Sequence, residues 1–504
     1  MHEDPFGELR SLLQGAPGAE RWGALVALLE AWADPEDLTR RAVPYALDIL
    51  RKEPGPRPAP LTWLGAIYDD PEEPAPLLPL ADTLAWAPYD GLEDDTFART
   101  LLERHDLGGV RDLSLEMTPL SERTLHELAE RLGPRLESLA LWYCVMPGVD
   151  SSALLEGSTF PRLESLDLGA NILSHLGWPR PGVFPSLTRL RLAVSLLNSR
   201  TCEALARAPF VTQLTALDVR QTQLVGQPLR EILSRLPETL ESLRLGGCPL
   251  ENADLLALCT SSFAPGLRVL DLGDALHLDE SQAFGLLDPL EATTAREDID
   301  LAAFIAHSGR LTSLHRFDLH QLRPPGYLLP LIARAEHLRS VRVLDLSINA
   351  LGVDGIDALL KTPMLEGVHT LDLSFNDAGP DLGEVLRRAS SLDHLRELSL
   401  RGNDLSGEGI EQLSTSSFFG RLERLDMYAC WLDVAAVTRA IEALSPDRIR
   451  DLDLSGNPID DRVARALVDA DLRALERLLL DRGSFSSRAR TSLRVRYPFV
   501  HFVY

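Results

Sequence analysis

Residues 341–351 read VRVLDLSINAL, and close copies of this stretch recur further along the chain. The copies read VHTLDLSFNDA from residue 368, LRELSLRGNDL from residue 395 and IRDLDLSGNPI from residue 449. Each copy alternates apolar and polar residues for a few positions and then has an asparagine just after the predicted strand. Such alternation predicts a short β-strand with one buried face. Recurrence at a fixed period predicts a stack of similar units.

The same pattern can be followed through most of the 504 residues. Taking the central apolar residue of each predicted strand gives fourteen positions: Leu113, Leu139, Leu166, Leu190, Leu217, Leu243, Leu270, Phe317, Leu344, Leu371, Leu398, Leu425, Leu452 and Leu478. Twelve of the thirteen steps between them span 24 to 27 residues, and the exception, from Leu270 to Phe317, spans 47. We therefore predict an insertion near residues 275–309. The period also leaves room for an outer helix in each unit, as at Gly352–Leu360 and Gly379–Arg388.

The pattern LxxLxLxxNxL resembles the leucine-rich repeat, and the period near 27 is similar to that of its ribonuclease-inhibitor-like subclass. The resemblance covers residues 109–504, about four fifths of the chain. It implies an α/β leucine-rich repeat solenoid (horseshoe), with a parallel concave β-sheet and a helical convex face. The subclass is characteristically intracellular. A helical segment ahead of the repeats is similar to that of some bacterial members of the family.

Polar residues at the asparagine position are expected to lie inside the stack. Five of the seven asparagines occupy it, namely Asn171, Asn349, Asn376, Asn403 and Asn457. An asparagine side chain both donates and accepts, so it can satisfy backbone groups where the strand turns. Three of the five cysteines take the same position in other repeats. Because the cysteines are odd in number and form no CxxC pair, we predict buried free thiols.

Residues 1–108 carry a different composition, with 21 acidic and 9 basic residues. We predict an acidic α-helical segment, with helices at Arg21–Trp32, Leu61–Tyr68 and Leu77–Trp86. It acts either as a cap over the first repeat or as a docking module with its own partner. At the other end, near residues 484–504, the apolar stretch YPFVHFVY predicts a closing strand or lid, and hence a C-terminal cap.

The net charge of −25 disfavours nucleic acid as a partner, because binding to a phosphate backbone requires a basic face. It favours a protein partner with a basic surface. No apolar run approaches the length of a membrane helix, and the acidic stretch MHEDPFGELR shows no secretory signal, so we predict a cytoplasmic protein that does not bind membranes. Oligomeric state is left open.

On each predicted strand, the residues between the buried ones line the concave surface. The position between the last two apolar residues, called here the strand column, is aspartate in eight of fourteen strands. Asp271, Asp318, Asp345 and Asp372 would form an unbroken run about 4.8 Å apart, which favours a cation in the groove. Two interpretations stay open: a structural consensus neutralised by nearby arginines, or a contribution to partner binding. Calcium is disfavoured, because a flat row cannot surround the ion with oxygens.

Aromatic and arginine side chains follow the strand column, and such residues anchor many protein interfaces. They suggest two patches, one near Trp142 and Tyr143 and one near Phe375 and Tyr428. For each of them, filling a gap at the rim is the alternative role. The predicted partner-binding residues are Trp142, Tyr143, Asp271, Asp318, His320, Asp345, Asp372, Phe375, Arg401, Asp426, Tyr428, Trp431 and Asp453.

Signatures of catalysis are missing from the sequence, which contains no P-loop, HExxH, GxSxG or GxGxxG motif. We predict no enzymatic activity, no cofactor and no metal. The favoured hypothesis is a non-catalytic interaction or scaffold protein that holds a basic protein on its concave face. One alternative is an activator-like regulator of a small GTPase, which a screen for stimulated GTP hydrolysis would test. The other is an architectural subunit that binds through its convex face or N-terminal segment.

Overall fold

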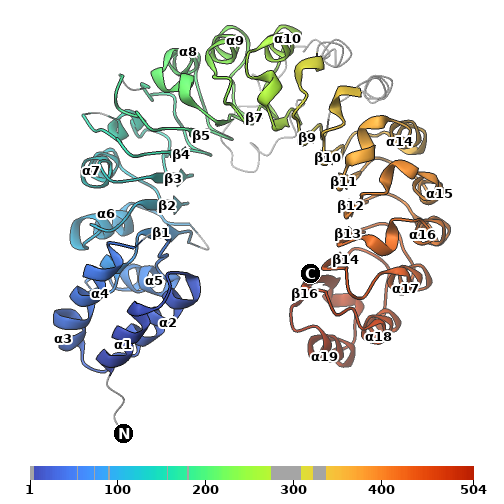
Figure 1. Ribbon diagram of the computed structural model, residues 1–504, viewed down its shortest axis with the longest axis horizontal. Coiled ribbons are helices and arrows are strands. Elements are labelled where there is room, and N and C mark those ends of the chain that lie inside the picture. The colour runs from blue at the N-terminus through green and yellow to red at the C-terminus, as the bar shows by residue number, and fades with distance from the viewer. Residues whose placement is uncertain are drawn as a thin grey trace. The chain divides into compact units, whose positions relative to one another are not determined.

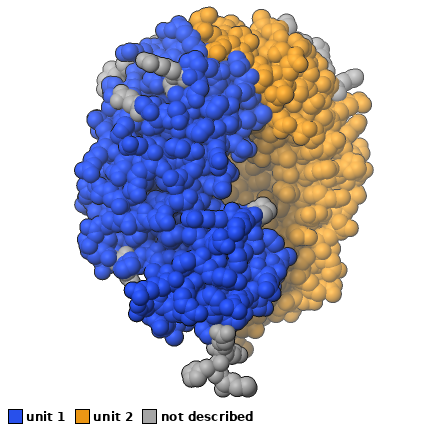
Figure 2. All heavy atoms as spheres, turned by 60° about the vertical axis from the view of Figure 1, so that its left-hand side comes forward, with its two compact units in different colours: residues 1–224 blue, residues 225–504 orange. Residues whose placement is uncertain are grey.

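The structure is a computed structural model that describes residues 5–53, 55–72, 74–88, 91–155, 157–178, 181–273, 308–321 and 336–503. Sixteen parallel strands follow one another in sequence order in one sheet, and most of the described repeats carry a helix on the opposite side (Figure 1). The chain divides into two compact units, residues 1–224 and 225–504, which Figure 2 colours separately. The predicted α/β repeat fold is confirmed.

Unit one begins with helices that bury their own apolar core. Their bounds are α1 Pro5–Gln14, α2 Ala19–Glu30, α3 Pro35–Asp37, the π-turn Leu38–Ala42, α4 Val43–Leu50 and α5 Leu61–Asp69. Trp22 and Trp63 meet edge to face with ring centroids 6.4 Å apart, and Leu25, Leu29 and Leu64 are almost fully buried beside them. The predicted helices at 21–32 and 61–68 are therefore confirmed to within two residues.

The helix predicted over Leu77–Trp86 is wrong. A short 3-10 turn at Leu78–Leu80 is followed by strand β1, Thr83–Trp86. Leu84 of β1 pairs with Leu113 of β2, so the sheet begins inside the segment expected to be wholly helical. The exposed edge of β2 would otherwise leave backbone groups unpaired, and this tertiary demand outweighs local preference.

The remaining elements of unit one form the first repeats. Their bounds are α6 Thr96–Arg104, β2 Asp112–Glu116, α7 Glu122–Leu132, β3 Ser138–Trp142, β4 Ser165–Asp167, β5 Arg189–Arg191, α8 Ser199–Arg207 and β6 Ala216–Asp218. Strand partners lie in register from repeat to repeat, as in Leu139 with Leu166 and Leu166 with Leu190. These central leucines are at most 2% exposed, so the inward face of every strand is core.

Unit two continues with the more regular repeats. Its strands are β7 Ser242–Arg244, β8 Val269–Asp271, β9 Arg316–Asp318, β10 Val343–Asp345, β11 Thr370–Asp372, β12 Glu397–Ser399, β13 Arg424–Asp426, β14 Asp451–Asp453, β15 Arg477–Asp481 and β16 Val500–Val503. Its helices are α9 Gly226–Arg235, α10 Asn252–Thr260, α14 Gly352–Leu360, α15 Leu382–Arg388, α16 Ser406–Ser414, α17 Val434–Ala443, α18 Asp461–Ala470 and α19 Ser487–Arg496. All fourteen predicted strand centres lie in strands.

Two predictions at the edges of the repeats have different outcomes. The insertion near residues 275–309 falls almost wholly outside the described residues; β8 and β9 nevertheless pair directly, with Leu270 opposite Phe317. The closing strand is confirmed, because β16 pairs in parallel with β15. Within the described residues, no helix is long and apolar enough to cross a membrane.

Buried asparagines join successive repeats of unit two. The Asn376 Oδ1 accepts from the backbone N–H of Asn349 and Leu351, at 3.1 and 3.3 Å. Its Nδ2 donates to the carbonyl oxygens of Leu346 and Leu373, at 2.9 and 3.0 Å. Asn349, Asn403 and Asn457 donate in the same way to the repeat before them. The predicted ladder is therefore confirmed, and it supplies the backbone at each strand end with partners.

Cysteine replaces asparagine in some repeats and keeps part of this bonding. All five cysteines are free and buried, as predicted. The thiols of Cys144 and Cys430 donate to the carbonyl oxygens of Leu115 and Leu400, at 3.2 and 3.1 Å, which is the contact the asparagine Nδ2 makes elsewhere. Burial raises the pKa of both thiols to about 12, so neither is a reactive thiolate near neutral pH.

Candidate functional site

The outward side of the strands, called here the sheet face, carries the strand column of aspartates. Each of the eight accepts, through Oδ1, a hydrogen bond from the backbone N–H two residues further on, at 2.8 to 3.2 Å. The carboxylate thereby closes the turn that ends the strand, as aspartate does in other turns. This bond explains the recurrence of aspartate in structural terms. It also engages only one oxygen of each carboxylate.

The aspartates differ in how far they reach solvent. Asp271, Asp318 and Asp453 are buried, at 4%, 8% and 6% exposure, whereas Asp345, Asp372 and Asp426 are half-buried. The strand pairings place Asp271, Asp318, Asp345 and Asp372 side by side as predicted. The half-buried members are the ones a partner can touch. A role in binding stays a prediction for all of them.

The proximity of like charges raises the pKa of two carboxyl groups in the strand column. Burial, followed by the charges of Asp318 and Asp372, raises the pKa of Asp345 to about 6. Burial and the neighbouring carboxylates also raise the pKa of Asp426 to about 6, although Arg401 lies 3.4 Å from its Oδ2. The sheet face therefore holds more negative charge than its own arginines neutralise, and a cation would relieve it.

His320 lies beside Asp271 and Asp318, the first two aspartates of this row. Its Nδ1 is 2.6 Å from the Oδ1 of Asp318, and its ring lies on Gly273, where a Cβ would be 2.0 Å from Nδ1. Burial would lower the pKa of His320, but Asp318, with Asp345 and Asp271, raises it to about 9. The pair is therefore an ion pair at neutral pH. One ligand atom each from Asp271, Asp318 and His320 lie within 4.8 Å of one another, so a metal ion here would compete with the proton on His320.

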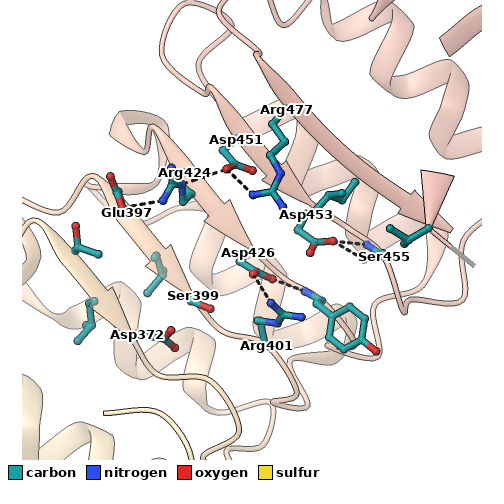
Figure 3. Close-up of a pocket in the computed structure, with 16 residues that line it drawn as sticks. Asp372, Glu397, Ser399, Arg401, Arg424, Asp426, Asp451, Asp453, Ser455 and Arg477 are labelled. Carbon is teal, nitrogen blue, oxygen red and sulfur yellow. Dashed lines mark hydrogen bonds and ion pairs between the residues drawn. The ribbon is translucent and has the colours of Figure 1, made fainter. Parts of the chain in front are cut away.

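A pocket of about 520 Å³ opens on the sheet face between β11 and β15 (Figure 3). Five carboxylates and three guanidinium groups line it, from Asp372, Glu397, Asp426, Asp451, Asp453, Arg401, Arg424 and Arg477. Two negative charges are therefore in excess. Small-molecule pockets are mostly apolar, so this charged lining suits side chains of a protein better than a small organic ligand.

Ion pairs within the pocket involve only some of its carboxylates. Arg424 bridges Glu397 and Asp451, at 3.5 and 3.2 Å, and Arg477 reaches Asp451 at 3.3 Å. Among the described residues, no arginine pairs with Asp372 or Asp453. The nearby arginines 424 and 477 pair with Asp451, which lies two residues before Asp453 on β14 and outside the strand column.

Three aromatic side chains follow strands β11 and β13, and one of them, Tyr428, lines the pocket. Arg401 stacks on Tyr428, with its Cζ 4.7 Å from the ring centroid. Phe375 covers Gly402 and is 45% exposed, and Trp431 is 72% exposed. Phe375 and Trp431 both have a left-handed backbone, with φ of 51° and 58°, although neither is glycine. These conformations hold large apolar rings at the strand ends, where solvent reaches them.

Unit one holds the other predicted patch. Trp142 covers Gly169, and the Cζ of Arg191 lies 4.8 Å from the centroid of the Trp142 ring. Tyr143 follows with a left-handed backbone, φ 54°. Arg191 is itself in the strand column and forms ion pairs with the aspartates on both neighbouring strands. These ion pairs were not predicted from the sequence. The predicted site residues therefore lie in two groups, one in each unit.

Known proteins with leucine-rich repeats are similar to this chain. The sequence profile of a family described as "Leucine Rich repeat" matches residues 337–360 and 392–414, so the chain contains leucine-rich repeats. An internalin from Listeria monocytogenes is 16% identical, with 68% of this chain and 87% of that chain covered and a TM-score of 0.37. A leucine-rich repeat protein from Leptospira interrogans is 17% identical, with 88% and 98% covered and a TM-score of 0.35. No curated protein matches the chain in sequence.

Proposed function

We propose that this chain is a non-catalytic scaffold that holds a basic protein partner on the sheet face of unit two. Leucine-rich repeat proteins generally serve as scaffolds for protein–protein interaction. We propose further that the partner has a basic surface, that the protein is cytoplasmic, and that it belongs to the ribonuclease-inhibitor-like subclass. Neither nucleic acid nor membrane is part of the proposal.

The observation that carries the proposal is the uncompensated charge of the sheet face. Asp345 and Asp426 have pKa values near 6, and the pocket beside them has two carboxylates more than guanidinium groups. Such a field accelerates encounter with a basic protein and selects against acidic ones. Tyr428 lines the pocket, and the exposed Phe375 and Trp431 follow the same strands, so all three offer the aromatic contacts that dominate interface energies.

Neutralising two of the aspartates should remove the partner without harming the fold. In a double variant Asp345→Asn and Asp372→Asn, each asparagine Oδ1 still accepts the turn bond from Ser347 or Ser374, while two negative charges are lost. We expect at least tenfold weaker binding, more so at low salt, because the lost attraction is screened at high salt. The measurement is parallel affinity purification from the host lysate, followed by titration of the recovered partner.

A matched control changes the same charge on the helical side of unit two. Glu408 of α16 and Glu442 of α17 are exposed, and Glu408→Gln with Glu442→Gln also removes two negative charges. Basic proteins should be retained by wild type and by this control, and lost from the Asp345/Asp372 variant. Equal retention by all three proteins would refute binding on the sheet face. It would favour an architectural subunit that binds through the helices or residues 1–108.

A further inference from the structure

Two three-residue arrangements of the strand column can be compared, one with an arginine on its middle strand and one with a serine. In unit one, the strand pairings align Asp167, Arg191 and Asp218 on β4, β5 and β6. In unit two, they align Asp372, Ser399 and Asp426 on β11, β12 and β13. Each arrangement has an aspartate on both outer strands. The middle strand carries an arginine in the first and a serine in the second.

Arg191 shows what the arrangement binds. Its Nη1 lies 3.2 Å from the Oδ2 of Asp167, and its Nε lies 3.6 Å from the Oδ2 of Asp218. One guanidinium group therefore bridges two carboxylates on alternate strands. The flat, forked guanidinium suits this task, because two nitrogens point at two acceptors at once.

Ser399 leaves the corresponding place in unit two without a cation from its own strand. Its Oγ lies 2.7 Å from the Oγ of Ser374, and Figure 3 shows Ser399 between Asp372 and Asp426. The Cα atoms of Asp372 and Asp426 are about 10 Å apart, two strand spacings. This gap opens into the 520 Å³ pocket, which is lined by all three residues.

The electrostatics of unit two agree with a missing positive charge. Arg401 approaches Asp426 from the strand end, at 3.4 Å, and among the residues that the structure describes it pairs with no other aspartate of the column. In the described part of the chain, Asp372 has no arginine partner, whereas Asp167 pairs with Arg191 and Asp218 pairs with both Arg191 and Arg220. The pocket retains its excess of two negative charges.

We infer that the gap over Ser399 is the binding site for one arginine side chain of the partner, whose guanidinium group bridges Asp372 and Asp426 as Arg191 bridges Asp167 and Asp218. This inference rests on the proposed function and adds to it the residue that the partner inserts. A lysine is the poorer occupant, because a single ammonium group cannot match two carboxylates with a planar fork.

The test places an arginine of this chain in the gap over Ser399. Ser399→Arg should reproduce the arrangement around Arg191 and exclude the partner's arginine; the fold tolerates it, since Arg191 stands in the same column. The matched control is Ser114→Arg on β2, which adds the same charge at the same column position. There the neighbouring column residues are Ala85 and Ala140, and neither carries a charge.

The probe is fluorescein-labelled nona-arginine, titrated by fluorescence anisotropy, with nona-lysine as the second probe. We expect wild type to bind nona-arginine more tightly than nona-lysine. Ser399→Arg should weaken nona-arginine binding at least tenfold, and Ser114→Arg less than twofold. Asp426→Asn should also weaken it, and should add little in the Ser399→Arg background, because both changes remove the same contact.

The remaining outcomes separate this inference from the proposed function. Equal losses in Ser399→Arg and Ser114→Arg would overturn the inference, since only net charge would then matter. No loss in Ser399→Arg, with a loss in the Asp345/Asp372 asparagine variant, would also overturn it but leave the sheet face as the binding surface. Unchanged binding in the asparagine variant would remove the proposed function itself.

Discussion

Replacing Asn376 by alanine should destabilise unit two by roughly 2–6 kcal/mol, at about 1–3 kcal/mol for each of the two buried N–H groups left unpaired. The carbonyl oxygens of Leu346 and Leu373 keep a partner, because they also accept from Asn349 and Asn403. Asn376 is fully buried, and its side chain serves the backbone N–H of Asn349 and Leu351 and the carbonyl oxygens of Leu346 and Leu373. Alanine offers none of these partners, and water cannot replace them inside the stack. Urea unfolding followed by circular dichroism measures the change.

Cysteine at the same position provides the graded comparison. The thiol of Cys430 donates to a carbonyl of the preceding repeat, so Asn376→Cys should keep one bond to Leu346 and lose the acceptor for the two N–H groups. Its cost should lie between wild type and alanine. A midpoint for Asn376→Ala equal to that of wild type would show that the ladder does not hold the repeats together.

Asp345→Asn should stabilise unit two at pH 7.5 by about 1–2 kcal/mol and leave it unchanged near pH 4. The pKa of Asp345 is raised from its ordinary value of 3.8 to about 6 by burial and by Asp318 and Asp372. The unfolded chain therefore gives up this proton at lower pH than the folded chain, and wild-type stability falls as pH rises from about 4 to 6. Each pKa unit corresponds to about 1.4 kcal/mol, which partial exposure reduces.

The contrast between variant and wild type isolates this group, because the raised pKa of Asp426 is present in both proteins. Asp345 also attracts the imidazolium of His320, and losing that attraction subtracts from the gain. Chemical unfolding of both proteins at pH 4, 6 and 7.5 measures the difference. A variant less stable than wild type at pH 7.5 would show that the carboxylate row is not under repulsion. The expected gain also means that weaker partner binding by Asp345→Asn with Asp372→Asn cannot be ascribed to unfolding.

Much of the fold could be predicted from the sequence because the constant repeat length determines which residues of successive strands are paired. The spacing from Leu344 to Leu371 and Leu398 is 27 residues each time, and the strands align these leucines as neighbours. The buried asparagines followed from the same count. Strand β1 could not be predicted, because TLAW at 83–86 lacks the repeat pattern and becomes a strand only by pairing with β2.

The residues of the candidate site could be predicted from the sequence, but their hydrogen bonds and ion pairs could not. The aspartate column was visible, whereas the turn bond from each aspartate Oδ1 to the N–H two residues later depends on the backbone after the strand. The small residues Ser347, Ser374 and Ser455 at those positions were the available signal. The likeness of Asp167–Arg191–Asp218 to Asp372–Ser399–Asp426 is readable once the register is known. That Arg191 bridges both neighbours, and that a pocket opens beside Ser399, required side-chain positions.

The most direct test of the account is to ask which face of unit two touches the partner. A photoreactive p-benzoylphenylalanine at Phe375 reports on the sheet face, and one at Leu256 of α10 reports on the helical side; the two side chains are 45% and 46% exposed, so their reach into solvent is matched. Irradiation in host lysate should give covalent adducts with basic proteins from position 375 and none from position 256. Adducts from position 256 alone would contradict the account.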